Sequence, residues 1–381
     1  MKKILIIVLI IGLIGGYFFI NNNKPLEKAS EESKARKVVE ESSDLFGRYY
    51  EQANSILSKM SLEEKIGQLF IVQYDINYAP KWVKNYNVGG FILFAKDFDG
   101  HTKKTIKDEI DNLQNISSNG LIIAVDEEGG FVTRISRYKA FRESKFLAPK
   151  DYYAEGGYEK LEEIETEKAN LLLSIGVNLN LAPVADVSTS EEDFINNRAF
   201  GKEANETADY IKHMVSYANK AGISSSLKHF PGYGNNVDTH TGIAIDNRDY
   251  ESISTNDYLP FIAGIEEKVP TILVSHNVIN CIDDKYPATL SEKVIKELRE
   301  KLGFSGIIIT DDLSMGAVKD YVKNGNAATL AIKAGNDLII TSSFEEMYNE
   351  VLEAVNNKEL DEKIIDQAVK RIIAYKLAYK M

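Results

Sequence analysis

Short apolar runs recur along almost the whole chain and are separated by polar or helix-like stretches. There are eight, each four or five residues long, which is the length of a buried strand rather than of a helix. They span residues 68–72, 90–94, 121–125, 177–181, 223–227, 271–274, 306–310 and 337–341. Eight alternating strand and helix units predict an α/β fold, a (β/α)8 TIM-type barrel forming a single catalytic domain.

An open, doubly wound parallel sheet is the structural alternative to the barrel. Such sheets commonly bind nucleotides through a G-x-G-x-x-G turn after a strand, and none of the apolar runs is followed by that pattern. The barrel is therefore favoured. Near the C-terminus, apolar residues spaced for one face between 364 and 377 predict an amphipathic helix that closes the domain.

The most informative loop follows the fifth run, where residues 227–240 read Leu-Lys-His-Phe-Pro-Gly-Tyr-Gly-Asn-Asn-Val-Asp-Thr-His. Proline and glycine interrupt the strand, so Lys228 and His229 are expected at its end. Asp238 lies two residues before His240, and a carboxylate there can accept the ring N–H, fix the tautomer and leave a proton on the other nitrogen. This pair therefore predicts a general acid that works near neutral pH.

A second pair of acids follows the run at 306–310. Asp311 and Asp312 come where a buried strand would present carboxylates at the rim of a barrel. One of the two is a candidate nucleophile, and the other is expected to accept backbone N–H groups at the start of the next helix. We favour Asp311 for the chemistry and Asp312 for support.

Several further motifs occur in order from about residue 60 onward. They are Asp126-Glu-Glu-Gly-Gly-Phe-Val-Thr-Arg134, Leu179-Asn-Leu-Ala-Pro-Val-Ala-Asp186, Asn197-Arg-Ala-Phe-Gly201, Val274-Ser-His-Asn277 and Pro287-Ala-Thr-Leu-Ser291. Together with the two loops above, the chain resembles the family 3 glycoside hydrolases, and within them the single-barrel β-N-acetylglucosaminidases of the peptidoglycan-recycling type. The family usually has Gln and Arg where this chain has Glu127 and Phe131.

The resemblance implies a role for each matching residue. Asp311 is the expected nucleophile, and His240 with Asp238 is the expected acid/base dyad. The residues expected to bind the terminal sugar are Asp126, Arg134, Arg198, Lys228 and His229. Arginines could instead form surface ion pairs, but sugar hydroxyls need fixed donors, which favours substrate contact.

Three more residues keep two interpretations. His276 follows a strand, so it is expected either to contact the sugar or to bind a carbonyl at the barrel rim. Asn180 and Asp186 could likewise contact substrate or bridge the rim. His229, His240 and His276 match no zinc-ligand spacing. We therefore predict no metal and no other cofactor.

The expected function is a retaining, exo-acting β-N-acetylglucosaminidase that releases terminal GlcNAc from a cell-wall glycan or muropeptide. Water is the default acceptor, although phosphate is a possible one. The rival enzyme is a broad β-glucosidase or β-xylosidase of the same family. The rival from another class is a tethered glycan-binding module, which would have no need of Asp311, Asp238 and His240.

The N-terminus predicts the location. Lys2 and Lys3 precede residues 4–20, which carry no charge; this run is longer than a usual signal core and just short of the roughly 20 residues that span a bilayer. No small-x-small cleavage site is obvious after it. We expect a membrane anchor or signal segment at 1–23, a polar stalk at 24–45 and the barrel at 46–381, outside the cytoplasm, or secreted if the segment is cleaved.

Composition limits the partners. The formal net charge of −12 argues against nucleic acid as a ligand. The single cysteine, Cys281, rules out an intramolecular disulfide. The 44% apolar content is enough for one large barrel, and a monomer is expected.

Overall fold

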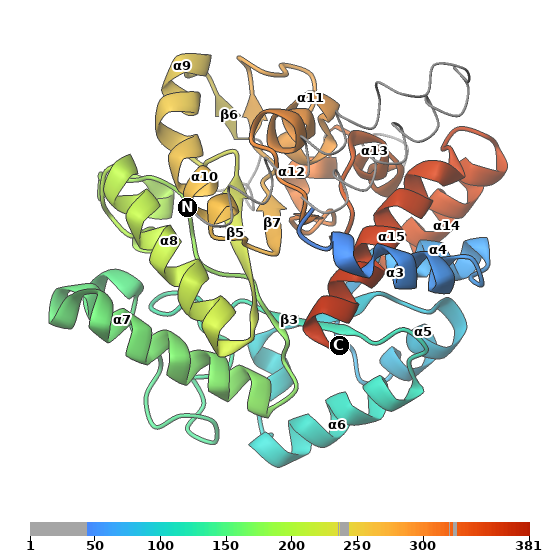
Figure 1. Cartoon of the computed structure of the whole chain (residues 1–381), viewed down its shortest axis with the longest axis horizontal. Coiled ribbons are helices and arrows are strands. Elements are labelled where there is room, and N and C mark those ends of the chain that lie inside the picture. Colours follow the sequence, from blue (N-terminus) through green and yellow to red (C-terminus); the bar gives the residue numbers. More distant parts are fainter. Residues whose placement is uncertain (1–43, 235, 237–243, 320, 323–325) are drawn as a thin grey trace, which may run out of the picture.

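The computed structural model of the chain describes residues 44–234, 236, 244–319, 321–322 and 326–381 (Figure 1). The predicted N-terminal segment at 1–23 and nearly all of the predicted stalk lie outside the described residues, so these boundaries stay predictions. Asp238 and His240 also lie outside them. Within the described part of the chain, no helix has both the length and the apolar character needed to cross a membrane.

Eight parallel strands form one sheet in the order β10-β1-β2-β3-β4-β5-β7-β9. They are β1 (Phe70–Gln73), β2 (Gly90–Leu93), β3 (Ile122–Val125), β4 (Leu179–Asn180), β5 (Ser224–Phe230), β7 (Thr271–Val274), β9 (Ile307–Thr310) and β10 (Ile339–Thr341). The two ends of this order also meet, because Thr310 N donates to Leu338 O at 3.0 Å and Leu313 N donates to Ile340 O at 3.1 Å. The ring of strands confirms the predicted barrel and excludes the open sheet.

Each predicted run overlaps one of these strands. The strand residues are almost all buried, as expected when helices cover a parallel sheet and side chains fill the barrel. The largest shift is in β5, which continues beyond 227 through Lys228 and His229 to Phe230. These two residues lie in the strand because Lys228 still pairs with the neighbouring segment of the barrel, where its carbonyl accepts the N–H of Ala185 at 2.7 Å.

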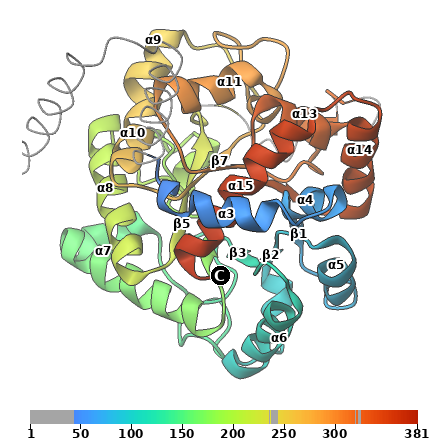
Figure 2. The same ribbon diagram turned by 45° about the vertical axis from the view of Figure 1, so that its right-hand side comes forward.

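Helices surround the ring and alternate with the strands (Figures 1 and 2). The α-helices of five or more residues are α3 (Tyr50–Leu57), α4 (Leu62–Gln68), α5 (Ala79–Tyr86), α6 (Lys103–Ile116), α7 (Pro149–Ser174), α8 (Ala204–Ala221), α10 (Tyr258–Glu266), α11 (Glu292–Lys296), α13 (Ala327–Ala334), α14 (Phe344–Asn356) and α15 (Glu362–Tyr379). Short turns of helix complete the connections: η1 (Gly47–Tyr49), η2 (Ala95–Phe98), η3 (Phe194–Asn197), α9 (Tyr250–Ser252), η4 (Ile253–Asp257), η5 (Ala288–Leu290), η6 (Glu297–Lys301) and α12 (Gly316–Lys319). A two-stranded sheet, β6 (Ile245–Asp246) with β8 (Val278–Ile279), lies beside the barrel.

Local sequence explains where several helices begin and end. Ser61 caps α4 in a capping box, since its hydroxyl accepts Glu64 N at 3.3 Å while the Glu64 carboxylate accepts Ser61 N at 2.9 Å. Helix α8 ends at Gly222, whose φ of 81° is in the left-handed region that glycine tolerates best. These signals fix the helix boundaries without help from distant residues.

The predicted C-terminal helix is α15, and it packs along α3 in both views (Figures 1 and 2). The predicted apolar face is buried at Ile365, Ala368, Val369, Ile372 and Ile373. The chain segments that follow the carboxyl ends of the strands lie together at one end of this barrel. That end carries Asp126 after β3, Lys228 and His229 within β5, and Asp311 after β9.

Candidate active site

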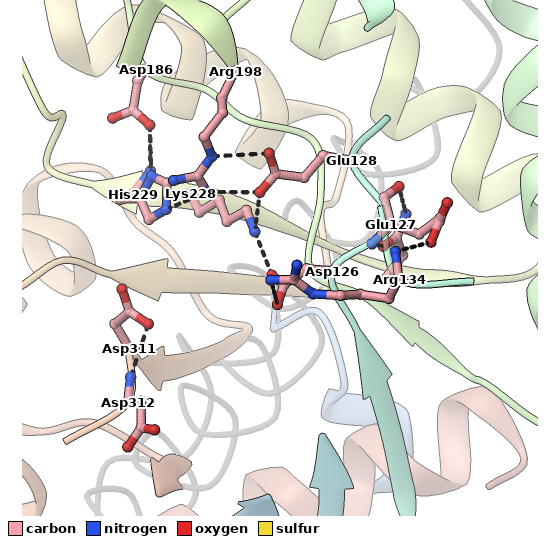
Figure 3. A network of polar contacts seen from close by, with 11 residues as sticks. Asp126, Glu127, Glu128, Arg134, Asp186, Arg198, Lys228, His229, Asp311 and Asp312 are labelled. Carbon is pink, nitrogen blue, oxygen red and sulfur yellow. Dashed lines mark hydrogen bonds and ion pairs between the residues drawn. The ribbon is translucent and has the colours of Figure 1, made fainter. Parts of the chain in front are cut away.

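Lys228 is the cation at the centre of the site (Figure 3). Its Nζ lies 2.6 Å from Asp126 Oδ1 and 2.6 Å from Glu128 Oε1, and its side chain is only 3% exposed. Asp126 follows β3, whereas Lys228 belongs to β5, so the contact joins two strand ends across the mouth of the barrel. The ammonium group has three donors, and these two contacts leave one for a ligand.

Glu128 links this lysine to Arg198. The guanidinium meets the carboxylate with two hydrogen bonds, Nε to Oε2 at 3.0 Å and Nη2 to Oε1 at 2.7 Å. Burial alone would raise the pKa of Glu128, but Arg198 and Lys228 more than offset it and hold that pKa well below its usual range. Glu128 is therefore a permanent anion that positions two cations.

The ring of His229 is held from both sides. Arg198 Nη2 lies 3.1 Å from His229 Nε2, and His229 Nδ1 lies 2.7 Å from Asp186 Oδ2. Because the guanidinium can only donate, Nε2 accepts and Nδ1 carries the proton that goes to Asp186. Asp186 also accepts the backbone N–H groups of His229 and Tyr233 at 3.1 and 2.8 Å. These contacts support a rim-bridging role for Asp186.

Glu127 binds the loop that follows it in the chain. Its buried carboxylate accepts the backbone N–H groups of Arg134 at 2.8 Å and Ile135 at 2.7 Å, and it also bonds to Ser136. Asn180 in turn binds the backbone of Glu127, with Oδ1 accepting Glu127 N at 3.0 Å. Glu127, which stands where the family usually has Gln, thus orders the loop between Asp126 and Arg134.

Arg134 reaches back from that loop to the site. Its Nη2 lies 3.7 Å from Asp126 Oδ2, and its guanidinium lies over the ring of Phe94 at 5.6 Å. Its buried Nε donates no hydrogen bond to any residue that the structure describes. The guanidinium therefore keeps donor capacity for a ligand.

Asp311 and Asp312 have different surroundings. Asp311 is half-buried, its Oδ1 accepts Asp312 N at 2.9 Å, and in the view of Figure 3 it lies between His229 and Asp312. Asp312 Oδ1 accepts Ser314 N at 2.8 Å, and burial raises the pKa of Asp312. The Asp312 contact supports its expected supporting role and leaves Asp311 as the candidate nucleophile.

His276 is fully buried beneath the loop after β9. Its Nε2 lies 3.0 Å from the carbonyl of Asp312, and its Nδ1 lies 2.8 Å from the hydroxyl of Thr289. These contacts support the carbonyl-binding interpretation, and contact of His276 with a sugar stays a prediction. Within the described residues, no group of three or more His, Cys, Asp or Glu side chains could hold a metal ion.

Asp126, Arg198, Lys228 and His229 thus lie in one contact network, with Arg134 at its edge. Glu128 stands in the same motif as Asp126, but its role as the counter-charge of Arg198 and Lys228 was not predicted. The sequence did contain an indication of this role. It predicted two cations at the site, Arg198 and Lys228, but only one carboxylate among the sugar-binding residues, Asp126. Buried cations need counter-charges, so a second acid was required.

The family model described as "Glycosyl hydrolase family 3 N terminal domain" matches residues 61–375. The chain belongs to glycoside hydrolase family 3. It is therefore a glycoside hydrolase, as the sequence motifs predicted.

Named relatives narrow the group within family 3. This family 3 chain is 32% identical to a beta-hexosaminidase of Hydrogenovibrio crunogenus over 273 residues, covering 70% of this chain and 75% of that protein. It is 31% identical to an uncharacterized secreted glycosyl hydrolase of Arthroderma benhamiae, covering 75% of this chain and 84% of that one. A family 3 β-N-acetylglucosaminidase structure from Paenibacillus has a TM-score of 0.78 and 28% identity, covering 84% of this chain and 63% of that chain.

We expect Glu128→Gln to destabilise this family 3 hydrolase by about 3 kcal/mol, because two buried cations lose the charge that compensates them. Lys228 and Arg198 would also lose their fixed positions, so kcat/KM should fall at least about tenfold. Urea unfolding at pH 7 and steady-state kinetics measure the two effects. Glu345→Gln is the control, since Glu345 makes a similar pair with Lys81 but is 41% exposed, and should change stability by less than about 1 kcal/mol.

The stability difference should also depend on pH. The pKa of Glu128 is lower in the folded state than in the unfolded chain, so its stabilisation is complete above about pH 5 and decreases as the pH falls through about 4. The gap between the wild type and Glu128→Gln should therefore narrow on acidification. A gap that stays constant from pH 7 to pH 4 would show that Glu128 does not carry this charge.

Proposed function

We propose that the chain is a retaining, exo-acting β-N-acetylglucosaminidase that releases terminal GlcNAc from cell-wall-derived glycans. The observation that carries the proposal is the fixed network of Asp126, Lys228, Glu128, Arg198 and His229, with Asp311 at the same end of the barrel. Such a network offers charged donors and acceptors at fixed positions, which is what a pyranose ring with several hydroxyls requires. The names of the beta-hexosaminidase relatives support the choice of sugar.

The proposed reaction has two displacement steps. Asp311 attacks the anomeric carbon, the bond to the leaving oxygen breaks, and protonated His240 gives that oxygen its proton. Water then attacks the glycosyl ester while neutral His240 removes its proton, and Asp311 leaves as a carboxylate. Asp238 accepts the other ring N–H and keeps the imidazole in the required tautomer.

Asp312 is a poorer choice of nucleophile than Asp311. Burial raises the pKa of the Asp312 carboxyl, so the anionic form that a nucleophile needs is less favoured. The acid is similarly hard to replace from nearby groups. Glu128 is held ionised by Arg198 and Lys228, so it has no proton to give at the site. The Glu127 carboxylate binds the backbone N–H groups of Arg134 and Ile135 instead.

Substrate choice and nucleophile can be tested together. The wild type should turn over an aryl β-N-acetylglucosaminide at least about tenfold faster than the aryl β-glucoside, since a hydroxyl cannot replace the contacts of the acetamido group. Asp311→Ala should lose nearly all turnover and keep substrate binding, because the covalent step disappears while the hydroxyl contacts remain. Steady-state kinetics and calorimetric titration with GlcNAc measure these outcomes.

Three results would contradict parts of this proposal. Preference for the glucoside or xyloside would favour the rival enzymes of the family. Sugar 1-phosphate formed preferentially in phosphate buffer would make the protein a phosphorylase. Asp311→Ala activity within about tenfold of the wild type would mean that another carboxylate, with Asp312 the next candidate, is the nucleophile.

The proposed acid can be separated from a structural histidine by the leaving group. A dinitrophenolate leaves without protonation, so His240→Ala should keep much more of the glycosylation rate, measured as kcat/KM, on dinitrophenyl β-GlcNAc than on a GlcNAc disaccharide. Asp238→Ala should show the same contrast more mildly, because the imidazole remains and loses only its orienting partner. An equal loss on both substrates would show that His240 is not the proton donor.

We also propose that the barrel acts outside the cytoplasm, held by the charge-free segment at 4–20. That run and the absence of an obvious cleavage site after it support an anchor. Fractionated cells should retain the full-length protein in the membrane pellet, with the barrel cut by protease added to intact, wall-stripped cells. A shortened, freely soluble form in the medium would indicate a cleaved signal instead.

A further inference from the structure

Arg248 binds two buried carboxylates beside the barrel mouth. Its Nη2 donates to Asp246 Oδ2 at 2.7 Å and to Asp257 Oδ1 at 3.1 Å, and its Nη1 donates to Asp257 Oδ2 at 2.8 Å. Its Nε lies 3.0 Å from Asp246 Oδ2. Each carboxylate side chain is 1% exposed, while that of Arg248 is 24% exposed. We call Asp246, Arg248 and Asp257 the Arg248 cluster.

The turn after β5 packs directly on this cluster. A Cβ atom added at Gly234 would lie 2.6 Å from Arg248 Nη2, and one added at Gly232 would lie 2.4 Å from Asp257 Oδ1. Both distances are shorter than real Cβ contacts allow, and the φ angles of 57° and 120° are also unfavourable for other residues. The position of the turn backbone therefore depends on the positions of the Arg248 guanidinium and the Asp257 carboxylate.

The same turn is held on its other side by the sugar-binding network. Tyr233 N donates to Asp186 Oδ1 at 2.8 Å, and Asp186 also accepts the His229 ring N–H. The glycines on either side of Tyr233 contact the Arg248 cluster. The turn is thus fixed between two groups of charged side chains.

The Arg248 cluster also holds the chain where residues 235–243 end. Asp246 belongs to β6, which pairs with β8, and Asp246 O accepts Asn280 N at 3.0 Å. Gly234 stands immediately before the segment 235–243, and Asp246 stands three residues after its last member. One guanidinium therefore lies against the residue just before this segment, Gly234, and binds Asp246, which follows it.

We propose that Arg248 is a positioning residue for proton delivery, because it sets the relative placement of the two ends of the segment that carries Asp238 and His240. This inference rests on the proposed function, in which those residues are the acid/base dyad. Proton transfer needs the donor within hydrogen-bonding distance of the leaving oxygen, so a small displacement of either end lowers its rate. A planar guanidinium can hold two carboxylates at a fixed angle, and a lysine cannot.

The test compares leaving groups in Arg248→Lys, which keeps the charge and removes the planar fork. We expect kcat/KM, which reports the glycosylation step, to fall about tenfold or more on a GlcNAc disaccharide and less than about threefold on dinitrophenyl β-GlcNAc. The Kd of GlcNAc should change little, since the sugar-binding residues keep their partners. Circular dichroism and thermal melting establish that the variant is folded.

Arg371→Lys is the matched control. Arg371 also pairs with a buried carboxylate, Asp337, through Nε at 2.8 Å, and its side chain is 26% exposed. Asp337 precedes β10 and therefore lies at the opposite end of the barrel from the site. This variant should lose a similar amount of stability and show no difference between the two leaving groups.

Gly234→Ala provides a second variant that keeps every charge of the cluster. Its added methyl group would displace the turn from Arg248, so it should show the same contrast between leaving groups. If both variants lower the two activities equally, the cluster is only structural and the proposal is overturned. His240→Ala is measured in parallel: a contrast in His240→Ala without one in Arg248→Lys overturns this inference alone, whereas no contrast in His240→Ala overturns the acid assignment and this inference with it.

Discussion

The carboxylate of Glu128 joins three chain segments at the mouth of the barrel. It stands after β3, and it holds Arg198 from the η3 loop and Lys228 from β5. Each of these charges would be costly to bury alone. Together with Asp126 they make two cations and two carboxylates, so the charges compensate one another. The compensation allows a charged site to stay ordered before substrate arrives, so little reorganisation accompanies binding.

Much of the architecture could be predicted from the sequence because the strands of a closed parallel barrel are buried on both faces. They therefore appear as short continuous apolar runs, and the polar residues after each run must meet at one end. By this rule Asp126, Lys228 and Asp311, which are far apart in the chain, belong to the same end of the barrel. The apolar pattern ended β5 too early, because Lys228 and His229 are polar in a strand that elsewhere is apolar or small.

Other features depend on the direction of side chains and could not be predicted from the pattern. Glu127 and Glu128 are adjacent acids, yet one accepts backbone N–H groups and the other binds side chains. The path of the loop after residue 128 decides which of the two carboxylates meets backbone N–H groups and which meets the cations. Similarly, the apolar spacing of α15 predicted its buried face but not Lys376, whose partners Gln68 and Gly120 lie 308 and 256 residues away. Burial lowers the pKa of Lys376 to about 7.

The turn at residues 231–234 connects the network around Lys228 to the Arg248 cluster. Asp186 binds both the His229 ring and Tyr233 N, so this histidine and the turn share one carboxylate. On the opposite side, Gly232 and Gly234 leave no room for side chains above the Arg248 cluster. Contacts within six residues of the chain, from His229 to Gly234, therefore link the two groups of charged side chains. Because this arrangement uses glycines and buried ion pairs, substitutions there should affect the geometry of the reaction as well as the stability of the barrel.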